Sequence, residues 1–163
     1  MSIDARAFRQ TVGRFATGVT VIATDVDGSI KAMTANSFTS LSLDPPLVLF
    51  CVGTNTKMGQ LIHQATGFSV NILRQEQEEL SAYFAGVWRQ ADPPLFSFVS
   101  WDGGPLLEGC LAALGCAVEK IYEGGDHWIV IGRVLALYRS EEACPPLLFC
   151  SGRYARLETP GPH

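Results

Sequence analysis

The chain has 163 residues, of which 47% are hydrophobic and 17% are charged, and its formal net charge at pH 7 is −4. This length is typical of one domain, which we place at residues 1–163 with a disordered tail from about residue 158. The acidic balance argues against nucleic acid as a partner, the lack of any apolar run near about 18 residues argues against a membrane span, and five cysteines without a CxxC pair argue against a structural metal.

The N-terminal segment predicts a helix followed by a hairpin. A cap at Ser2 or Asp4 precedes apolar residues at helical spacing, so we expect a short helix that ends before residue 18. Its apolar stripe comprises Ala5, Phe8, Val12 and Phe15. The β-branched run after Gly18 and the turn signal Asp27-Gly28 then predict a β-hairpin. No signal-peptide pattern precedes these elements, so we expect a cytoplasmic protein with reduced thiols.

The middle of the chain alternates short strands with single helices. Pro45-Pro46 introduces LVLFCV, a short buried strand. A helix over 56–65 follows, with Thr54 or Asn55 as its cap and Gly67 as its end. A strand over 68–73 and a helix over 75–85, stopped by a glycine at position 86, come next.

The C-terminal part predicts a long loop, a long hairpin and a last strand. Residues 87–105 hold prolines, glycines and two tryptophans, and loops of this length often cover a site. Strand-like runs over 111–122 and 128–138 flank EGGDH, and Pro145-Pro146 introduces one final strand, LLFCSGRY. Hairpin-joined strands with singly inserted helices predict a mainly β fold, an antiparallel barrel with peripheral helices. No GxGxxG motif supports a dinucleotide-binding fold.

Small polar side chains form a row from Thr34 to Ser42, just before the double proline. If the row lies on a strand and the bend after it, alternate side chains such as Thr34 and Asn36 project together. Hydroxyl and amide groups in this arrangement suit a flat heteroaromatic ring with polar atoms along its edge. From composition alone, a solvated edge strand, in which Ser and Thr satisfy local backbone groups, is the commoner explanation.

Three shorter motifs have both a functional and a structural interpretation. GTNTK, residues 53–57, would offer a phosphate the free N–H groups of a helix start together with Thr56 and Lys57, or would simply cap the helix. In GGDH, Asp126 could orient His127, although an ordinary turn with an idle histidine is the commoner case. Arg153 in SGRY could hold a phosphate or carboxylate or form a surface ion pair.

No nucleophile with a neighbouring base is evident, since no GxSxG elbow or cysteine signature frames the Ser, Cys and His residues. A bound cofactor would therefore supply the reactivity of any enzyme built on this chain.

Taken in chain order, six segments resemble the flavin reductase family of short split-barrel proteins, over Phe8 to Tyr154. They are FRQTVGRFATGVTVIAT, MTANSFTSLSLDPPLVLFCV, FSVNIL, FAG, GDHWIVIGRV and LLFCSGRY. The resemblance implies an FMN-binding split antiparallel β-barrel that reduces FMN or FAD with NADH or NADPH. It also implies a homodimer that passes reduced flavin to a separate monooxygenase.

By position, the resemblance assigns site residues. The isoalloxazine ring and ribityl chain would lie against Thr34, Ala35, Asn36, Ser37, Thr39 and Ser40, beside Cys51, Val52 and Gly53. The flavin phosphate would meet Asn55, Thr56 and Lys57. The nicotinamide would lie by Tyr154 and His127, the latter as the catalytic residue, and no metal is implied. Asn36, where the family often has a small residue, and residues 87–101 depart from the family pattern.

The reaction implied is hydride transfer from nicotinamide C4 to flavin N5, for which the protein supplies mainly proximity and orientation. Flavin would then act as a reversibly bound substrate. A flavin-binding carrier module and a flavin-dependent oxidase with the same barrel remain the alternative interpretations.

Overall fold

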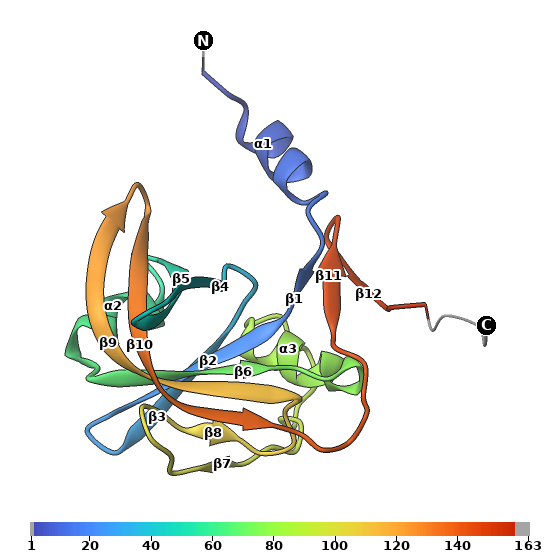
Figure 1. Cartoon of the computed structure of the whole chain (residues 1–163). Helices are drawn as coiled ribbons and strands as arrows, with labels where there is room; N and C mark the ends of the chain where they lie inside the picture. The colour runs from blue at the N-terminus through green and yellow to red at the C-terminus, as the bar shows by residue number, and fades with distance from the viewer. Residues whose placement is uncertain (1, 159–163) are drawn as a thin grey trace.

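A seven-stranded antiparallel sheet forms the centre of the computed structural model, which describes residues 2–158 (Figure 1). The strand order is β3-β2-β6-β9-β10-β5-β4. The bounds are β2 (Thr20–Val26), β3 (Ser29–Ala35), β4 (Thr39–Leu43), β5 (Pro46–Gly53), β6 (Gly67–Ile72), β9 (Ala112–Gly124) and β10 (His127–Arg139). Because β3 also contacts β5, the sheet curls back on itself, and the expected mainly β, antiparallel architecture is confirmed.

Two smaller sheets complete the β structure. One pairs β1 (Thr17–Gly18), β11 (Leu148–Cys150) and β12 (Arg153–Ala155), and the other pairs β7 (Phe98–Val99) with β8 (Leu106–Leu107). The prediction of a single last strand is wrong. Ser151 and Gly152 adopt φ values of 52° and 75°, and this left-handed turn folds LLFCSGRY into the hairpin β11–β12.

Five short helical segments lie around the sheet in residues 2–158: α1 (Ala5–Val12), α2 (Lys57–Leu61) with its extension η1 (Ile62–Gln64), and η2 (Gln75–Gln77) followed by α3 (Glu78–Phe84). Asp4 caps α1 by accepting a hydrogen bond from Ala7 N at 2.8 Å. The cap of α2 is Thr56 and not the expected Thr54 or Asn55, because the Thr56 hydroxyl accepts a hydrogen bond from Gly59 N at 3.0 Å. No helix in the described part of the chain is long and apolar enough to cross a membrane.

Gly67 does not end the α2 segment, as the sequence suggested, but begins β6. A Cβ on Gly67 would lie 2.0 Å from the carbonyl oxygen of Gly103. The residue is therefore glycine because the 103–104 backbone packs directly on the sheet, and the turn before β6 is closed by Ala65 instead.

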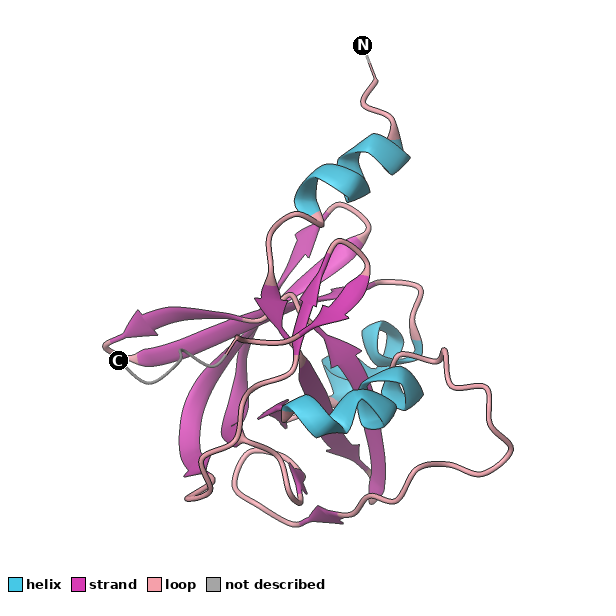
Figure 2. Ribbon diagram, turned by 90° about the vertical axis from the view of Figure 1, so that its right-hand side faces the viewer, coloured by secondary structure: helices cyan, strands magenta, loops and turns pink. Residues whose placement is uncertain are grey.

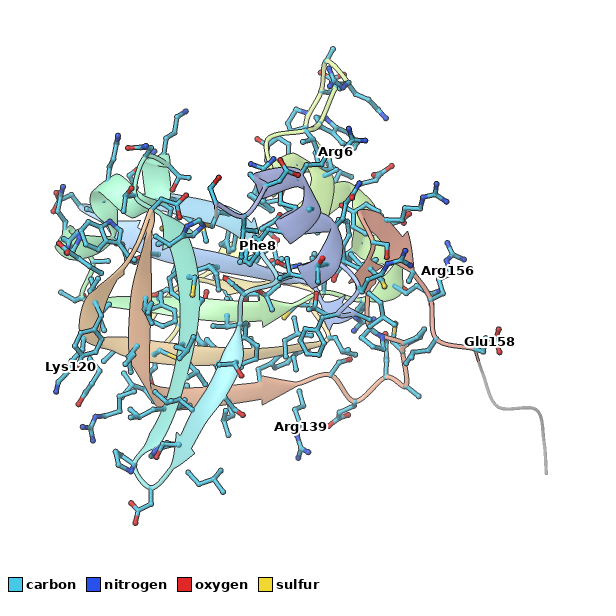
Figure 3. The ribbon with its side chains drawn as sticks, turned by 90° about the horizontal axis from the view of Figure 1, so that it is seen from above. Arg6, Phe8, Lys120, Arg139, Arg156 and Glu158 are labelled. Atoms are coloured by element: carbon cyan, nitrogen blue, oxygen red, sulfur yellow. The ribbon has the colours of Figure 1, made fainter. Side chains whose placement is uncertain are left out.

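Helix α1 stands away from the barrel and joins it through β1 (Figures 1 and 2). Of the predicted apolar stripe, Ala5, Phe8 and Val12 lie on α1 and Phe15 follows the helix, and nothing in the described chain covers them. The exposed fractions are 56% for Phe8, 51% for Val12 and 79% for Phe15. Figure 3 shows Phe8 on α1 as seen from above.

The core lies between the curved halves of the main sheet. Phe50 of β5 and Phe68 of β6 are fully buried and meet edge to face, with ring centroids 4.9 Å apart. Phe68 also covers Gly132 of β10, where a Cβ would lie 2.4 Å from its ring. A second apolar cluster, which includes Val19 and Leu80, fixes α3 and the β11–β12 hairpin beside β3.

Candidate functional site

The polar row runs from the end of β3, across a bend, into the edge strand β4. At the bend, the Ser37 hydroxyl donates to the carbonyl oxygen of Cys51 at 2.9 Å and accepts from the amide of Cys51 at 3.0 Å. Ser37 therefore joins the β3 side of the barrel to β5. Thr39 and Ser40 follow on β4, where both are exposed.

A pocket of about 280 Å³ opens at the β3 end of this row. Its wall is mostly apolar and includes Thr34, Ala35, Asn36, Ser81, Ala85 and Tyr154. The Thr34 hydroxyl donates to the carbonyl oxygen of Ser81 at 2.6 Å, and the Tyr154 hydroxyl donates to Ser81 Oγ at 2.8 Å. Asn36 is exposed, and its side-chain amide has no hydrogen-bond partner among the described residues, so it is available to a ligand.

A second group of predicted residues gathers where β5 ends. Gly53 pairs directly with His127 at the start of β10. The backbone amide and the hydroxyl of Thr54 both donate to the carbonyl oxygen of Asp126, at 3.0 and 3.2 Å. Thr54 and Asp126 lie 72 positions apart in the sequence, and these bonds hold the GTNTK and GGDH turns side by side.

Asp126 and His127 form the pair that the sequence suggested. His127 Nδ1 lies 2.7 Å from Asp126 Oδ1, and the His127 side chain is 49% exposed. The hydrogen bond from His127 lowers the pKa of the Asp126 carboxyl. Because a carboxylate only accepts, the proton of the neutral imidazole belongs on Nδ1, and Nε2 is left free. An ideal Cβ on Gly53 would lie 3.9 Å from this Nε2.

The structure supports the capping interpretation of Thr56. Its hydroxyl donates to the carbonyl oxygen of Gly53 at 2.8 Å and accepts from Gly59 N, so it has no proton left to donate to a phosphate. Asn55 and Lys57 are exposed beside it, and Lys57 belongs to no ion pair among residues 2–158. The predicted anion contact therefore depends on the Lys57 ammonium and the Asn55 amide.

Val52 and Cys51 of β5, both predicted to lie beside the flavin, differ in the groups that they can offer to a ligand. Val52 is buried in the core with 2% exposure, so only its backbone can face a ligand. Burial raises the pKa of the Cys51 thiol, which keeps this sulfur in its neutral form at pH 7.

The predicted nicotinamide residues do not contact each other. Tyr154 lines the pocket with Ser81, whereas His127 lies with Gly53 at the other end of the row. Asn36 lines the same pocket as Tyr154, and the next residue, Ser37, bonds to Cys51, two positions before Gly53; we call this series of residues the path. Along this path, the apolar pocket is followed by a polar strip, which consists of Asn36 and the bonded pair Ser37–Cys51. The exposed, cationic Lys57 comes after the end of β5.

Sequence reasoning missed two residues that line the pocket: Ser81 on α3 and Ala85, the C-cap of this helix. Their spacing of four residues puts both on one helix face, and their small size leaves room beside β3. Two small residues four positions apart were therefore the sequence signal that could have identified this side of the pocket. A larger hollow, about 410 Å³ beside Trp101, contains none of the predicted site residues. No cluster of metal-binding side chains occurs in the described part of the chain.

Comparison with known proteins gives a consistent result. The family model described as "Flavin reductase like domain" matches residues 12–158. The reductase subunit HsaB of a flavin-dependent monooxygenase from Rhodococcus jostii is 40% identical over 161 residues, which covers 96% of this chain and 80% of that protein. An NADH-dependent FAD reductase from Streptomyces globisporus is 42% identical over 159 residues, which covers 94% of this chain and 86% of that protein.

Solved structures agree in fold. The flavin reductase PheA2 in its native state superposes with a TM-score of 0.90 and 42% identity, over 96% of this chain and all of that one. The Streptomyces globisporus NADH:FAD oxidoreductase SgcE6, in complex with NAD and FAD fragments, superposes with a TM-score of 0.86 and 38% identity, over 99% of both chains.

Proposed function

The chain belongs to the flavin reductase family, and we propose that it reduces free FMN or FAD with NADH or NADPH and supplies the reduced flavin to a separate monooxygenase. The observation that carries this proposal is the path from the apolar pocket, past Asn36 and Ser37, to Lys57. The relatives named above act on FAD with NADH or serve a monooxygenase, which supports the same assignment.

The residues along this path suit the parts of a flavin. The apolar wall of the pocket suits an aromatic ring, and the free amide of Asn36 suits its polar edge. Gly53 carries no side chain between Thr56 and His127, so ligand atoms can approach the backbone there. Lys57 supplies positive charge for a phosphate in a chain whose net charge is −4.

Bound flavin supplies hydride acceptance from the nicotinamide, and the protein's residues supply binding and orientation. The Ser37–Cys51 hydrogen bonds hold the polar strip rigid. Asp126 fixes the His127 imidazole with Nε2 facing Gly53, ready to accept a hydrogen bond from a ligand. No proton transfer to a side chain is required in the central step, which fits the absence of a nucleophile with its base in the sequence.

Initial rates with the four combinations of FMN or FAD and NADH or NADPH test the function. We expect oxidation of the dinucleotide that requires added flavin and exceeds the background of free flavin. If no combination exceeds that background, a carrier module is the better interpretation. Retention of yellow colour through gel filtration, together with oxygen uptake on a small organic substrate, would favour an oxidase.

His127 should contribute to dinucleotide use, because its Nε2 lies beside Gly53, at one end of the proposed flavin site. We expect His127→Ala to lower kcat/KM for the dinucleotide by about 10-fold, equal to about 1.4 kcal/mol of transition-state stabilisation. Asp126→Asn should lower it less, because an amide can still orient the ring. Glu123→Gln is the matched control, an exposed carboxylate in the same hairpin. A wild-type kcat/KM for His127→Ala would rule out this role.

The uncovered apolar stripe of α1 supports a homodimer, in which a second copy covers it. Phe8, Val12 and Phe15 are more than half exposed, and Leu43 and Leu137 on the barrel are 95% and 74% exposed. We expect light scattering at micromolar concentration to show twice the 17.7 kDa mass, and Phe8→Glu with Phe15→Glu to yield monomers. A wild-type protein of 17.7 kDa would contradict this proposal.

We further infer a cytoplasmic location. All five cysteines are free thiols in the structure, as a reducing compartment maintains them.

A further inference from the structure

We propose that Ser81 is a positioning residue of the flavin pocket, and that it fixes the pocket wall by holding Thr34 and Tyr154 together. The inference rests on the proposed function, because it concerns the same pocket. No part of it requires Ser81 to touch the flavin.

Ser81 connects three segments that are far apart in the sequence. It lies on α3 and is only 2% exposed. Its carbonyl oxygen accepts from Thr34 Oγ1 of β3, and its hydroxyl oxygen accepts from the Tyr154 phenol of β12. Thr34 lies 47 positions before Ser81, and Tyr154 lies 73 positions after it. These bonds join the main sheet to the small C-terminal sheet across α3.

The two bonds also decide what the pocket presents to a ligand. Each hydroxyl has a single proton, and both protons are directed at Ser81. The apolar parts of Thr34 and Tyr154 are therefore left to line the pocket. This explains why the wall is mostly apolar although Thr34, Ser81 and Tyr154 all carry hydroxyl groups. An aromatic ring is the ligand that such a wall accommodates.

Tyr154 depends on Ser81 for its orientation. Its ring packs edge to face against Phe149, with centroids 5.6 Å apart, so the ring is held on one side by an aromatic contact and at its tip by Ser81 Oγ. Without the tip bond, the ring can turn about its side-chain dihedrals into the neighbouring space of about 280 Å³. A rotated ring would occupy part of the volume that the flavin needs.

The first experiment is a double-mutant cycle with Ser81→Ala, Tyr154→Phe and the double variant. Both single variants remove the same hydrogen bond but keep the ring and the helix. We expect each to raise the KM for flavin by about 10-fold, the size expected for one hydrogen bond, with little change in kcat. The double variant should be no worse than either single variant, because the bond is already lost.

The second experiment separates positioning from general stability by comparing Thr34→Val with Thr24→Val. The Thr24 hydroxyl donates to the carbonyl oxygen of Gly67 at 2.6 Å, the same distance and acceptor type as for Thr34, but Thr24 is fully buried and away from the pocket. We expect both variants to lower the melting temperature and only Thr34→Val to weaken FMN binding in a fluorescence titration.

Wild-type FMN affinity in Ser81→Ala and Thr34→Val, or an equal loss of affinity in Thr24→Val, would overturn the proposal. Fully additive effects in the cycle would do the same. These results differ from failure of the proposed function, in which the wild-type protein itself neither binds FMN nor oxidises NADH or NADPH with added flavin.

Discussion

Replacing Gly59 with alanine is expected to weaken FMN binding by at least about 10-fold and to cost about 1–3 kcal/mol of stability, the usual range for overpacking. A Cβ at this position would lie 2.0 Å from the carbonyl oxygen of Gly53 and 3.2 Å from Cα of Thr54. Both neighbours are backbone atoms and cannot rotate away. Helix α2 must therefore move, and the 53–57 turn that carries Lys57 must move with it.

A loss of stability in Gly59→Ala would be the opposite of the usual result, because replacing glycine with alanine in an ordinary helix interior stabilises a protein by about 0.5–1 kcal/mol. Gly18→Ala is the control, since a Cβ there meets nothing within 4 Å. Urea denaturation and FMN titration of both variants make the comparison. If Gly59→Ala is as stable as the wild type and binds FMN equally well, the close approach of α2 to the end of β5 does not position the site.

Phe68→Ala should cause the largest loss of stability, about 3–5 kcal/mol, as is typical for truncation of a buried phenylalanine. Phe68 is fully buried, contacts Phe50 edge to face, and fills the space that Gly132 leaves open. Its removal would leave a cavity at the centre of the barrel. Urea denaturation measures the change in the free energy of unfolding.

Leu95→Ala is the matched control for this core variant, because Leu95 is 99% exposed. It should change stability by less than about 0.5 kcal/mol. A loss below about 1 kcal/mol for Phe68→Ala would show that the barrel interior is not packed around this ring.

β-Branched and apolar runs, together with turn signals, were sufficient to predict most strands of the main sheet, although not their order. The hairpin at Asp27-Gly28 has φ values of 53° and 78°, as the turn signal implies, and the long β9–β10 hairpin forms around EGGDH. Errors arose where a contact distant in sequence decides the outcome. Gly67 resembles a helix end but is required by the approach of Gly103, which no local pattern reveals.

The polar row shows why a site is harder to predict than a strand. Sequence alone could not tell which hydroxyls are used within the fold. Ser37 bonds to the backbone of Cys51 and so joins two parts of the barrel, and Thr34 bonds to the backbone of Ser81. Much of the row therefore has a structural use, and its contact with flavin stays a prediction. Asn36 is the member with a side-chain amide left free for a ligand.

Helix α1 illustrates a different limit. Its cap and apolar stripe follow from the sequence, but the surface that covers the stripe does not. Periodicity identifies a buried face only if the burying partner is in the same chain.

A crystal structure with bound FMN tests the central claim most directly. We predict the isoalloxazine ring beside Asn36 and the Ser37–Cys51 link, the phosphate at Lys57, and one face of the ring open to a nicotinamide. Flavin bound elsewhere, for example in the hollow beside Trp101, or a ring covered on both faces by side chains, would contradict the account.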